Sequence, residues 1–227
     1  MSLAISELLR RSTLFGELSP TELEALARAA ELREFARDEV IFAMFEPADG
    51  LYVLTGGRVK VCISTSEGKE LIIATLGPGQ FFGEMALLDD EPRSASVVAQ
   101  LPTTAYRIHR SDFDRLVEAH PSIARKLMRE LSLRLRRANA QMESLATLDV
   151  LGRLARYLID LARQHGQVIG NAWVAVRRPT HQDIANSIGT TRETVTRLMS
   201  DLEQRGLVVN EGKMSYLREE VLQREGE

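Results

Sequence analysis

The chain has 227 residues, of which 44% are hydrophobic and 27% are charged, and its net charge is −3. This composition is ordinary for a globular protein with room for two small domains, and it excludes a chain that binds nucleic acid through overall positive charge. No apolar run reaches the length of about 20 residues that spans a bilayer, and the first residues lack the apolar core of a signal peptide. We therefore expect a cytoplasmic protein.

Cysteine and histidine usage narrows the chemistry. Cys62 is the only cysteine, which excludes an intrachain disulfide and a cysteine-ligated iron–sulfur cluster within one chain. The histidines, His109, His120, His165 and His181, lack metal-ligand spacing. No pattern of serine, histidine and aspartate or of paired carboxylates emerges. The sequence therefore predicts no metal site and no enzyme.

The N-terminal region changes from a helical pattern to a strand pattern. Residues from about Ser6 to Ala30 are predicted to be helical, with Ser19 as an N-cap, Pro20 at the first helical position and Glu22 three residues after the cap. From about residue 32 to 108 the apolar period becomes two, and glycine pairs mark turns. Many short strands with glycine turns predict an antiparallel roll.

A segment within this strand-rich region places polar groups in an apolar run. It contains Glu84, Arg93 and Ser94, and charged residues are rarely buried unless something pairs with them. Glu84 can accept from a sugar hydroxyl, Arg93 can grip a phosphate with two N–H groups, and Ser94 with nearby backbone amides can complete an anion shell. The alternative is a strand–turn–strand with an internal Glu84–Arg93 salt bridge. The spaced set as a whole favours a ligand.

One long helix follows. From Ile123 to about Thr147 there is no glycine or proline, and Pro121 marks the break before it. Apolar residues recur at steps of four and three, which forms a heptad seam that requires a partner helix. The seam consists of Leu131, Leu135, Ala138, Met142 and Leu145. The first part, up to Leu131, can instead pack on its own domain. The remainder, which polar residues flank, predicts a two-fold homodimer.

The C-terminal region reads as a helix-turn-helix with a wing. Asp149 is expected to cap a helix from Val150 to about Gln164, and residues 172–176 read as a strand. Thr180 is expected to cap the first helix of the motif, with Asp183 three residues later, and Gly189 supplies the left-handed turn. Thr190 or Thr191 caps the second helix, and a hairpin of residues 207–209 and 214–217 with a turn at 210–213 follows.

The second helix of this motif carries charge at its exposed N-terminal end. Arg192, Glu193, Thr196 and Arg197 lie on the face opposite Val195. Arginine can pair with guanine and glutamate can accept from cytosine in the major groove. The alternative is an ordinary surface helix with charge pairs four residues apart, such as Glu193 with Arg197. The caps, the glycine turn and the hairpin together favour DNA recognition.

Two segments resemble known motifs. The set Gly83, Glu84, Leu87, Pro92, Arg93, Ser94, Ala95 and Val97 resembles the phosphate-binding cassette of cyclic-nucleotide-binding domains in the CRP/FNR family of bacterial regulators. The run of residues 191–197 resembles the recognition helix of catabolite activator proteins in the same family. The resemblance covers nearly the whole chain. It implies a dimeric, ligand-gated transcription factor that engages RNA polymerase, while the single cysteine argues against the oxygen-sensing branch.

The resemblance also implies the site residues. The expected nucleotide contacts are Gly83, Glu84, Met85, Arg93, Ser94, Ala95, Arg134, Ala138 and Asn139. Ala138 and Asn139 stand where catabolite activator proteins have a threonine–serine pair that reads adenine, and Arg134 is expected to pair with Glu84 or with the ligand. The expected DNA contacts are Thr180, Gln182, Thr191, Arg192, Glu193, Thr194, Thr196 and Arg197. Cyclic AMP is the expected effector, with cyclic GMP as a weaker competitor.

The predicted fold is therefore α+β, in three parts. Residues 1–121 form a jelly-roll cyclic-nucleotide-binding domain, residues 122–148 a dimerisation helix, and residues 149–227 a winged helix-turn-helix domain. One alternative is a family member whose effector domain is ligand-independent or takes a different ligand. A cyclic-nucleotide-gated enzyme is excluded, because no catalytic domain is left over once these parts are assigned.

Overall fold

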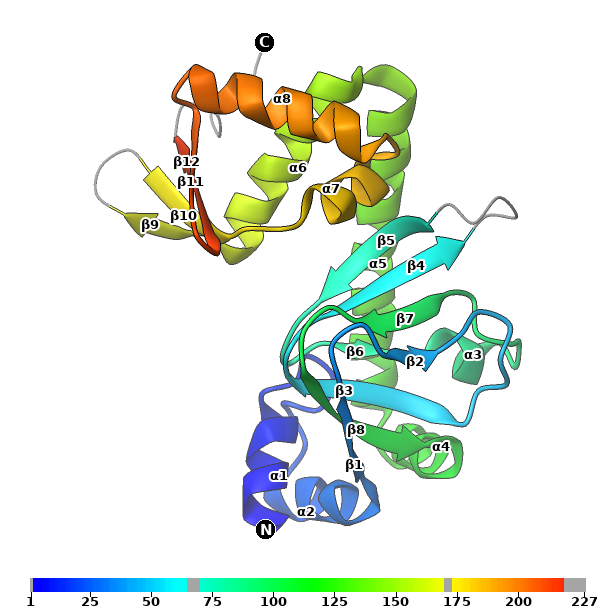
Figure 1. Cartoon of the computed structure of the whole chain (residues 1–227). Helices are drawn as coiled ribbons and strands as arrows, with labels where there is room; N and C mark the ends of the chain where they lie inside the picture. Colours follow the sequence, from blue (N-terminus) through cyan, green and yellow to red (C-terminus); the bar gives the residue numbers. More distant parts are fainter. Residues whose placement is uncertain (1, 65–69, 170–172, 219–227) are drawn as a thin grey trace. The chain divides into compact units, whose positions relative to one another are not determined.

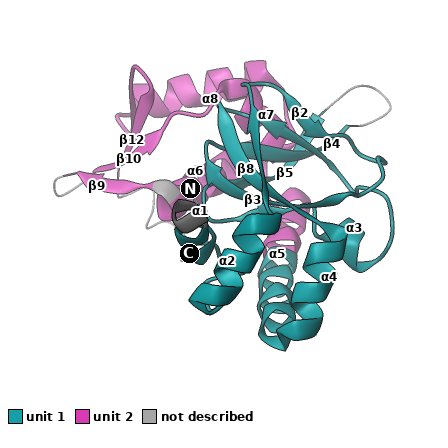
Figure 2. Ribbon diagram, turned by 90° about the horizontal axis from the view of Figure 1, so that it is seen from below, with its two compact units in different colours: residues 1–136 teal, residues 137–227 magenta. Residues whose placement is uncertain are grey.

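The computed structural model describes residues 2–64, 70–169 and 173–218. The chain divides into two compact units, residues 1–136 and 137–227, which Figure 2 shows in different colours. Within the described ranges, no helix is both long enough and apolar enough to cross a membrane.

Two helices open the first unit, α1 (Ser2–Arg10) and α2 (Pro20–Ala29). The prediction of one helical region is corrected here, because residues 11–19 form turns between the two helices. The predicted start at Ser19 is confirmed. The Ser19 hydroxyl accepts from the Glu22 amide at 3.4 Å, and the Glu22 carboxylate accepts from the Ser19 amide at 2.7 Å. The backbone N–H groups of Ser19 and Glu22, which would otherwise lack partners at the helix start, thus each donate to a side chain three residues away.

Two four-stranded antiparallel sheets form the body of this unit (Figure 1). Their strand orders are β1-β8-β3-β6 and β2-β7-β4-β5. The strands are β1 (Glu31–Phe35), β2 (Val40–Phe42), β3 (Gly50–Gly56), β4 (Val59–Ser64), β5 (Glu70–Leu76), β6 (Phe81–Phe82), β7 (Ser96–Ala99) and β8 (Thr103–His109). The predicted antiparallel roll is confirmed.

The segment that contains Glu84 and Arg93 borders the aromatic core of the roll. The stacked rings of Tyr52 and Phe82, 5.1 Å apart, pack with Phe42 between the sheets. The segment between β6 and β7 leaves this core as a loop that contains a short helix, α3 (Met85–Leu88). The alternative of a plain strand–turn–strand is therefore wrong. Figure 1 shows α3 beside the loop that joins β2 to β3.

Two helices follow the roll, α4 (Arg110–Ala119) and α5 (Pro121–Thr147). The long helix was predicted over residues 122–148, and it begins one residue earlier, because proline is tolerated in a first turn, and ends at Thr147. Ile123 and Leu127 are buried in the core of the first unit, and Leu131 packs against it. The expectation that this first part packs on its own domain is confirmed. Further along, Leu135 is 62% exposed.

The second unit contains two helices of a compact motif and a small sheet. The elements are α6 (Val150–His165), β9 (Gln167–Ile169), β10 (Trp173–Arg177), α7 (His181–Ile188), α8 (Arg192–Gln204), β11 (Val208–Glu211) and β12 (Met214–Arg218). The sheet order is β11-β12-β10-β9. Ile184, Val195 and Leu217 lie in the shared core. Ala172, which was predicted to begin a strand, lies outside the described residues.

The local signals for the helix-turn-helix are confirmed. Asp149, Thr180 and Thr191 cap α6, α7 and α8, each accepting from the amide three residues later. Gly189 adopts φ +66° and ψ +53°, the left-handed conformation that glycine tolerates. The hairpin needs one correction. Its turn is narrower than predicted, because Asn210 pairs with Ser215 and Glu211 pairs with Met214 within the strands.

Candidate functional site

Arg93 is the central residue of the candidate nucleotide site, and only 2% of its surface is exposed. Its Nη1 donates to the Gly83 carbonyl at 2.6 Å. Its Nη2 donates to the Gly50 carbonyl at 2.7 Å and to the Asp49 carboxylate at 3.1 Å. The Phe42 ring lies 4.1 Å from the guanidinium carbon. Burial lowers the pKa of Arg93 and Asp49 opposes that shift, so the side chain remains a cation.

Glu84, the acid of the cassette, is also only 2% exposed. Its Oε1 accepts from Arg134 Nη1 at 2.8 Å, and Arg134 Nη2 donates to the Phe81 carbonyl at 2.5 Å. The expected pairing of Arg134 with Glu84 is therefore confirmed. The alternative of a direct salt bridge between Glu84 and Arg93 is not what the structure shows, since the acid pairs with Arg134 and the cation with Asp49.

Each of these two residues keeps one buried atom without a hydrogen-bond partner. Among the described residues, the buried side-chain nitrogens and oxygens that lack a partner are Glu84 Oε2, Arg93 Nε and His181 Nε2. Leaving a buried polar group unpaired costs about 1–3 kcal/mol. Glu84 Oε2 requires a donor and Arg93 Nε requires an acceptor. A ligand that brings a hydroxyl and an anionic oxygen would supply both.

The backbone at Gly83 approaches Arg93 so closely that no side chain would fit between them. Gly83 has φ +82°, and a Cβ built at this position would lie 2.7 Å from Arg93 Nη1. Arg110, the first residue of α4, holds the short helix from its other end. It donates to the carbonyls of Ala86 and Leu87 and to the Asp90 carboxylate. The loop is thus braced on both sides.

The other predicted nucleotide contacts are distributed along the chain. Ser94 is exposed, and its hydroxyl contacts Met85 Sδ at 3.7 Å. Ala95 is buried at the start of β7, next to the cassette. Ala138 and Asn139 are exposed residues of α5 in the second unit, beyond Arg134 along the same helix. The structure therefore brings Gly83 into contact with Arg93 and Glu84 into contact with Arg134, and the two pairs are joined through the neighbouring residues Gly83 and Glu84.

Sequence reasoning missed Asp49, Phe42 and Arg110. Asp49 and Arg93 are separated by 44 residues in the sequence, so no periodicity or motif connects them. Asp49, which directly precedes β3, contacts Arg93 only because the folded roll brings the start of β3 beside the cassette.

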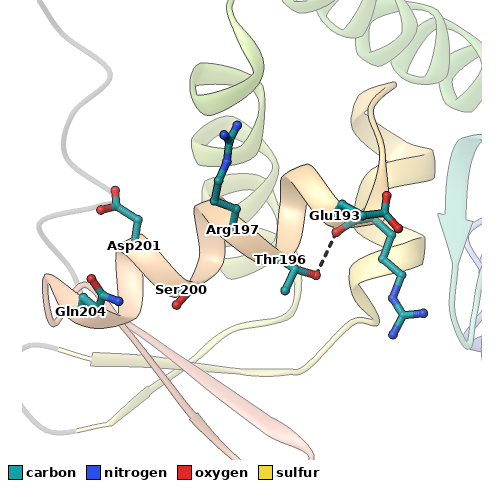
Figure 3. Close-up of a pocket in the computed structure, with 7 residues that line it drawn as sticks. Glu193, Thr196, Arg197, Ser200, Asp201 and Gln204 are labelled. Carbon is teal, nitrogen blue, oxygen red and sulfur yellow. Dashed lines mark hydrogen bonds between the residues drawn. The ribbon is translucent and has the colours of Figure 1, made fainter.

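The second candidate site is the exposed face of α8 (Figure 3). A hollow on this face is lined by Arg192, Glu193, Thr196, Arg197, Ser200, Asp201 and Gln204. Val195 is fully buried on the opposite side and Met199 is nearly so. The predicted division of the helix into a buried stripe and an exposed charged face is confirmed. The exposed face carries two guanidinium groups and a carboxylate within the first two turns, a set of groups suited to base edges in a major groove.

The remaining expected DNA contacts, Thr180, Gln182, Thr191 and Thr194, lie near the starts of α7 and α8. The Thr180 hydroxyl accepts from the Asp183 amide and donates to its carboxylate, so it acts as a cap but without the full capping box. The Gln182 side-chain amide donates to Asn186. The Thr191 and Thr194 hydroxyls contact each other at 2.9 Å. These exposed polar groups are positioned by local bonds at the N-terminal ends of α7 and α8.

His181 is the residue of this surface that sequence reasoning left unassigned. It is half-buried, and its Nδ1 lies 2.9 Å from Thr196 Oγ1 on α8. Burial lowers its pKa, and nearby Arg178 and Arg192 lower it further, whereas Glu203 raises it. No single-sequence pattern links a residue at the start of one helix to the middle of the next.

Both units match known families. A cyclic nucleotide-binding domain model matches residues 32–120, and a Crp-like helix-turn-helix domain model matches residues 152–225. A CRP-like cAMP-activated global transcriptional regulator of Mycobacterium tuberculosis is 32% identical over 209 residues, which covers 92% of this chain and 93% of the relative. The cyclic AMP receptor protein of Thermus thermophilus is 32% identical over 88% of this chain and 89% of the relative.

A solved structure agrees with these relatives. FixK2 from Bradyrhizobium japonicum superposes with a TM-score of 0.75 at 27% identity, covering 85% of this chain and 95% of that one. These relatives are regulators of transcription rather than enzymes. Because both halves match the family's domains in the expected order, the chain belongs to the CRP/FNR family of transcriptional regulators.

Proposed function

We propose that this regulator is switched by a cyclic nucleotide, with cyclic AMP as the effector and cyclic GMP as a weaker competitor. The observation that carries the proposal is the pair of buried atoms without partners, Glu84 Oε2 and Arg93 Nε. A ribose hydroxyl would donate to Glu84, and a cyclic phosphate would accept from Arg93. The two relatives described above are named for cyclic AMP, which supports the same ligand class.

At Ala138 and Asn139 the chain departs from the threonine–serine pair of catabolite activator proteins, so the choice of adenine rests on Asn139. An asparagine amide can accept from adenine N6 and donate to N7, whereas alanine offers no polar group. A second candidate is a regulator that works without a nucleotide. It is favoured by the contacts that these two side chains already make, since Asp49 holds Arg93 and Arg134 holds Glu84.

We propose further that the regulator is a homodimer. The seam residues beyond Leu131 are exposed in the single chain, with Leu135 at 62%, Met142 at 59% and Leu145 at 40%. Exposed apolar residues spaced by heptads on one helix are typical of a coiled-coil interface. A two-fold pair would bury the same stripe twice.

The dimer would bind a palindrome through two copies of α8. We expect half-sites that resemble TGTGA and lie about one helical turn apart, roughly 34 Å, on one face of the DNA. In this proposal residues 1–121 bind the nucleotide, residues 122–148 form the dimer, and residues 149–227 bind DNA. The regulator would engage RNA polymerase in the cytoplasm. Cyclic AMP can favour the DNA-binding state only if it binds that state more tightly.

Two measurements test the proposal. Calorimetry with cyclic AMP, with cyclic GMP and with buffer alone would establish the ligand. Arg93→Ala should cost about 1.5–3 kcal/mol of binding free energy, because it removes a charge-assisted contact. Lack of binding by the unmodified protein at millimolar nucleotide would favour the nucleotide-independent candidate, and unchanged affinity of Arg93→Ala would place the site elsewhere.

A selection from random duplexes, with and without cyclic AMP, tests the proposed DNA recognition and its dependence on the nucleotide. Enrichment of a palindrome only when the nucleotide is present supports both DNA recognition and gating. If no palindrome is recovered, α8 does not have the proposed role in DNA recognition. If the palindrome binds equally well with and without cyclic AMP, the nucleotide does not control DNA binding.

A further inference from the structure

The first residue of α7 is hydrogen-bonded to the middle of α8, and the direction of this bond follows from proton counting. Thr196 Oγ1 donates to the Arg192 carbonyl at 2.9 Å, and His181 Nδ1 lies 2.9 Å from the same oxygen. A threonine hydroxyl carries one proton, and a carbonyl only accepts. Both contacts are hydrogen bonds at once only if the hydroxyl donates to the Arg192 carbonyl and His181 Nδ1 donates to the hydroxyl, and we adopt this arrangement. The imidazole hydrogen is therefore on Nδ1.

The surroundings keep this imidazole neutral. Its Nε2 is buried without a partner, so a proton there would have no acceptor. The cations Arg178 and Arg192 also disfavour a charged ring, and Glu203 is the acid that opposes them. A neutral ring with hydrogen on Nδ1 still donates to Thr196. The bond is therefore a stable feature of this surface.

This bond decides which group Thr196 presents to solvent. Threonine in a helix divides between two rotamers, because its hydroxyl can bond to a carbonyl of the preceding turn. Here the hydroxyl is held by two bonds, one to its own helix and one from His181. Figure 3 shows the hydroxyl directed back along α8 and the carbon branch directed away from the helix. What Thr196 offers outward is therefore its methyl group.

We propose that Thr196 reads the methyl group of a thymine, and that His181 is the positioning residue that holds Thr196 in this orientation. The inference rests on the proposed binding of α8 in the major groove. Thr196 is exposed and lies one turn from Arg192 on the lined face of α8. Thymine is the base that presents a methyl group in the major groove, and a threonine methyl is one of the apolar groups that contact it.

The test compares thymine with deoxyuridine, which lacks only that methyl group. The full-length protein is measured on its selected duplex, and each thymine of one half-site is replaced by deoxyuridine in turn. We expect one position at which the replacement weakens binding about fourfold, the factor for burying one methyl-sized group. Thr196→Ser, which keeps the hydroxyl and removes the methyl, should abolish the difference at that position alone. Thr21→Ser, an exposed threonine on α2, is the matched control and should leave the ratio unchanged.

The role of His181 is tested by loss and rescue. His181→Ala frees Thr196 to change rotamer and should bring the thymine-to-deoxyuridine ratio toward one, whereas His181→Gln keeps a side-chain N–H donor and should restore part of it. Because the ratio compares two duplexes with the same protein sample, a partly unfolded variant does not change it.

Each outcome is decisive. If no thymine of the half-site is sensitive, or if Thr196→Ser keeps the difference, Thr196 does not read a methyl group. If His181→Ala keeps the full ratio, His181 does not position Thr196. Failure to select any duplex would instead refute the proposed DNA-binding role of α8, so the two failures are distinguishable.

Discussion

Asp49 and Arg93 form an ion pair within the candidate nucleotide site, with the carboxylate Oδ1 3.1 Å from Nη2. The Asp49 side chain is half-exposed, while that of Arg93 is buried. The second oxygen of Asp49 also pairs with Arg107. The positive charge of Arg93, which would attract a phosphate, is therefore already partly neutralised by Asp49. The negative charge of Asp49 would in turn repel that phosphate.

This relationship predicts that Asp49→Asn binds a cyclic nucleotide more tightly. The amide oxygen still accepts from Arg93, but the charge that repels a phosphate is gone. Pairs of this exposure are worth up to about 1 kcal/mol, so we expect an increase of up to about fivefold that shrinks as salt is added. Calorimetry at low and physiological salt checks this, with Asp38→Asn as the control at an exposed surface pair. Weaker binding would show that Asp49 chiefly orients Arg93.

Gly83→Ala should abolish nucleotide binding. The added Cβ would lie 2.7 Å from Arg93 Nη1, and the backbone has φ +82°. The guanidinium must then move from the position in which it donates to the Gly83 and Gly50 carbonyls and to Asp49. Gly206→Ala is the matched control, because its φ is +68° but a Cβ there meets nothing within 4 Å. Both variants place alanine in the left-handed region, which costs about 1–2 kcal/mol in thermal unfolding, and Gly83→Ala adds its clash with Arg93, yet only Gly83→Ala should lose binding in calorimetry.

Leu135→Lys should dissociate the proposed dimer without unfolding the chain. Leu135 is 62% exposed in the single chain, so lysine fits there in the monomer, but a dimer would have to bury its charge. Light scattering at micromolar concentration should report a dimer for the unmodified protein and a monomer for the variant. Leu32→Lys, at a 50% exposed leucine on β1, tests for a general effect of the added charge. A monomeric unmodified protein would contradict the proposed dimer.

Substitutions on α8 should separate affinity from base choice. Arg192→Ala should cost about 1–3 kcal/mol and relax the preference at one guanine. Glu193→Ala should relax the preference at one C·G pair more than it weakens binding, since it also removes a repulsive acid. Competition between duplexes with single base changes measures both effects. Arg205→Ala removes an exposed arginine at the end of the same helix and should leave base preference intact. Equal losses on every duplex would mean that neither residue reads bases.

Cys62 should be unreactive in the folded protein. It is 2% exposed, and burial, with a smaller contribution from the charge of Glu70, raises its pKa to about 12. The reactive form is the thiolate, so a raised pKa leaves the neutral thiol dominant at pH 8.5. Alkylation followed by mass spectrometry should show little modification at pH 8.5 and full modification in urea. Rapid labelling of the native protein would contradict the buried position of this residue.

The sequence alone predicted features that depend on neighbours within one turn. The caps at Ser19, Asp149 and Thr191 and the left-handed turn at Gly189 are all found as expected. A cap joins a side chain to an amide three residues away, so its partners are visible in a short window. The buried and exposed faces of α8 followed from helical periodicity for the same reason.

Other expectations from the sequence lacked spatial detail. Arg134 was expected to pair with Glu84 or with the ligand, and it pairs with Glu84, but Asp49, the partner of Arg93 from 44 residues away, was not predicted. The heptad pattern of α5 continued through Leu131 and Leu135 without a break. The sequence offered packing on its own domain only as an alternative for the part up to Leu131, and the structure confirms it, since Leu131 packs against the core of its unit while Leu135 is exposed.

Local chemistry therefore determined the helices, the turns, the identity of the cassette and the charged face of α8. Tertiary structure decided which atoms remain unpaired, which carboxylate holds Arg93, and which group Thr196 presents outward. The physical reason is the distance along the chain over which each interaction acts. Caps and periodicity act over a few residues of chain, whereas burial and the pairing of distant polar groups exist only after the sheets and helices have packed.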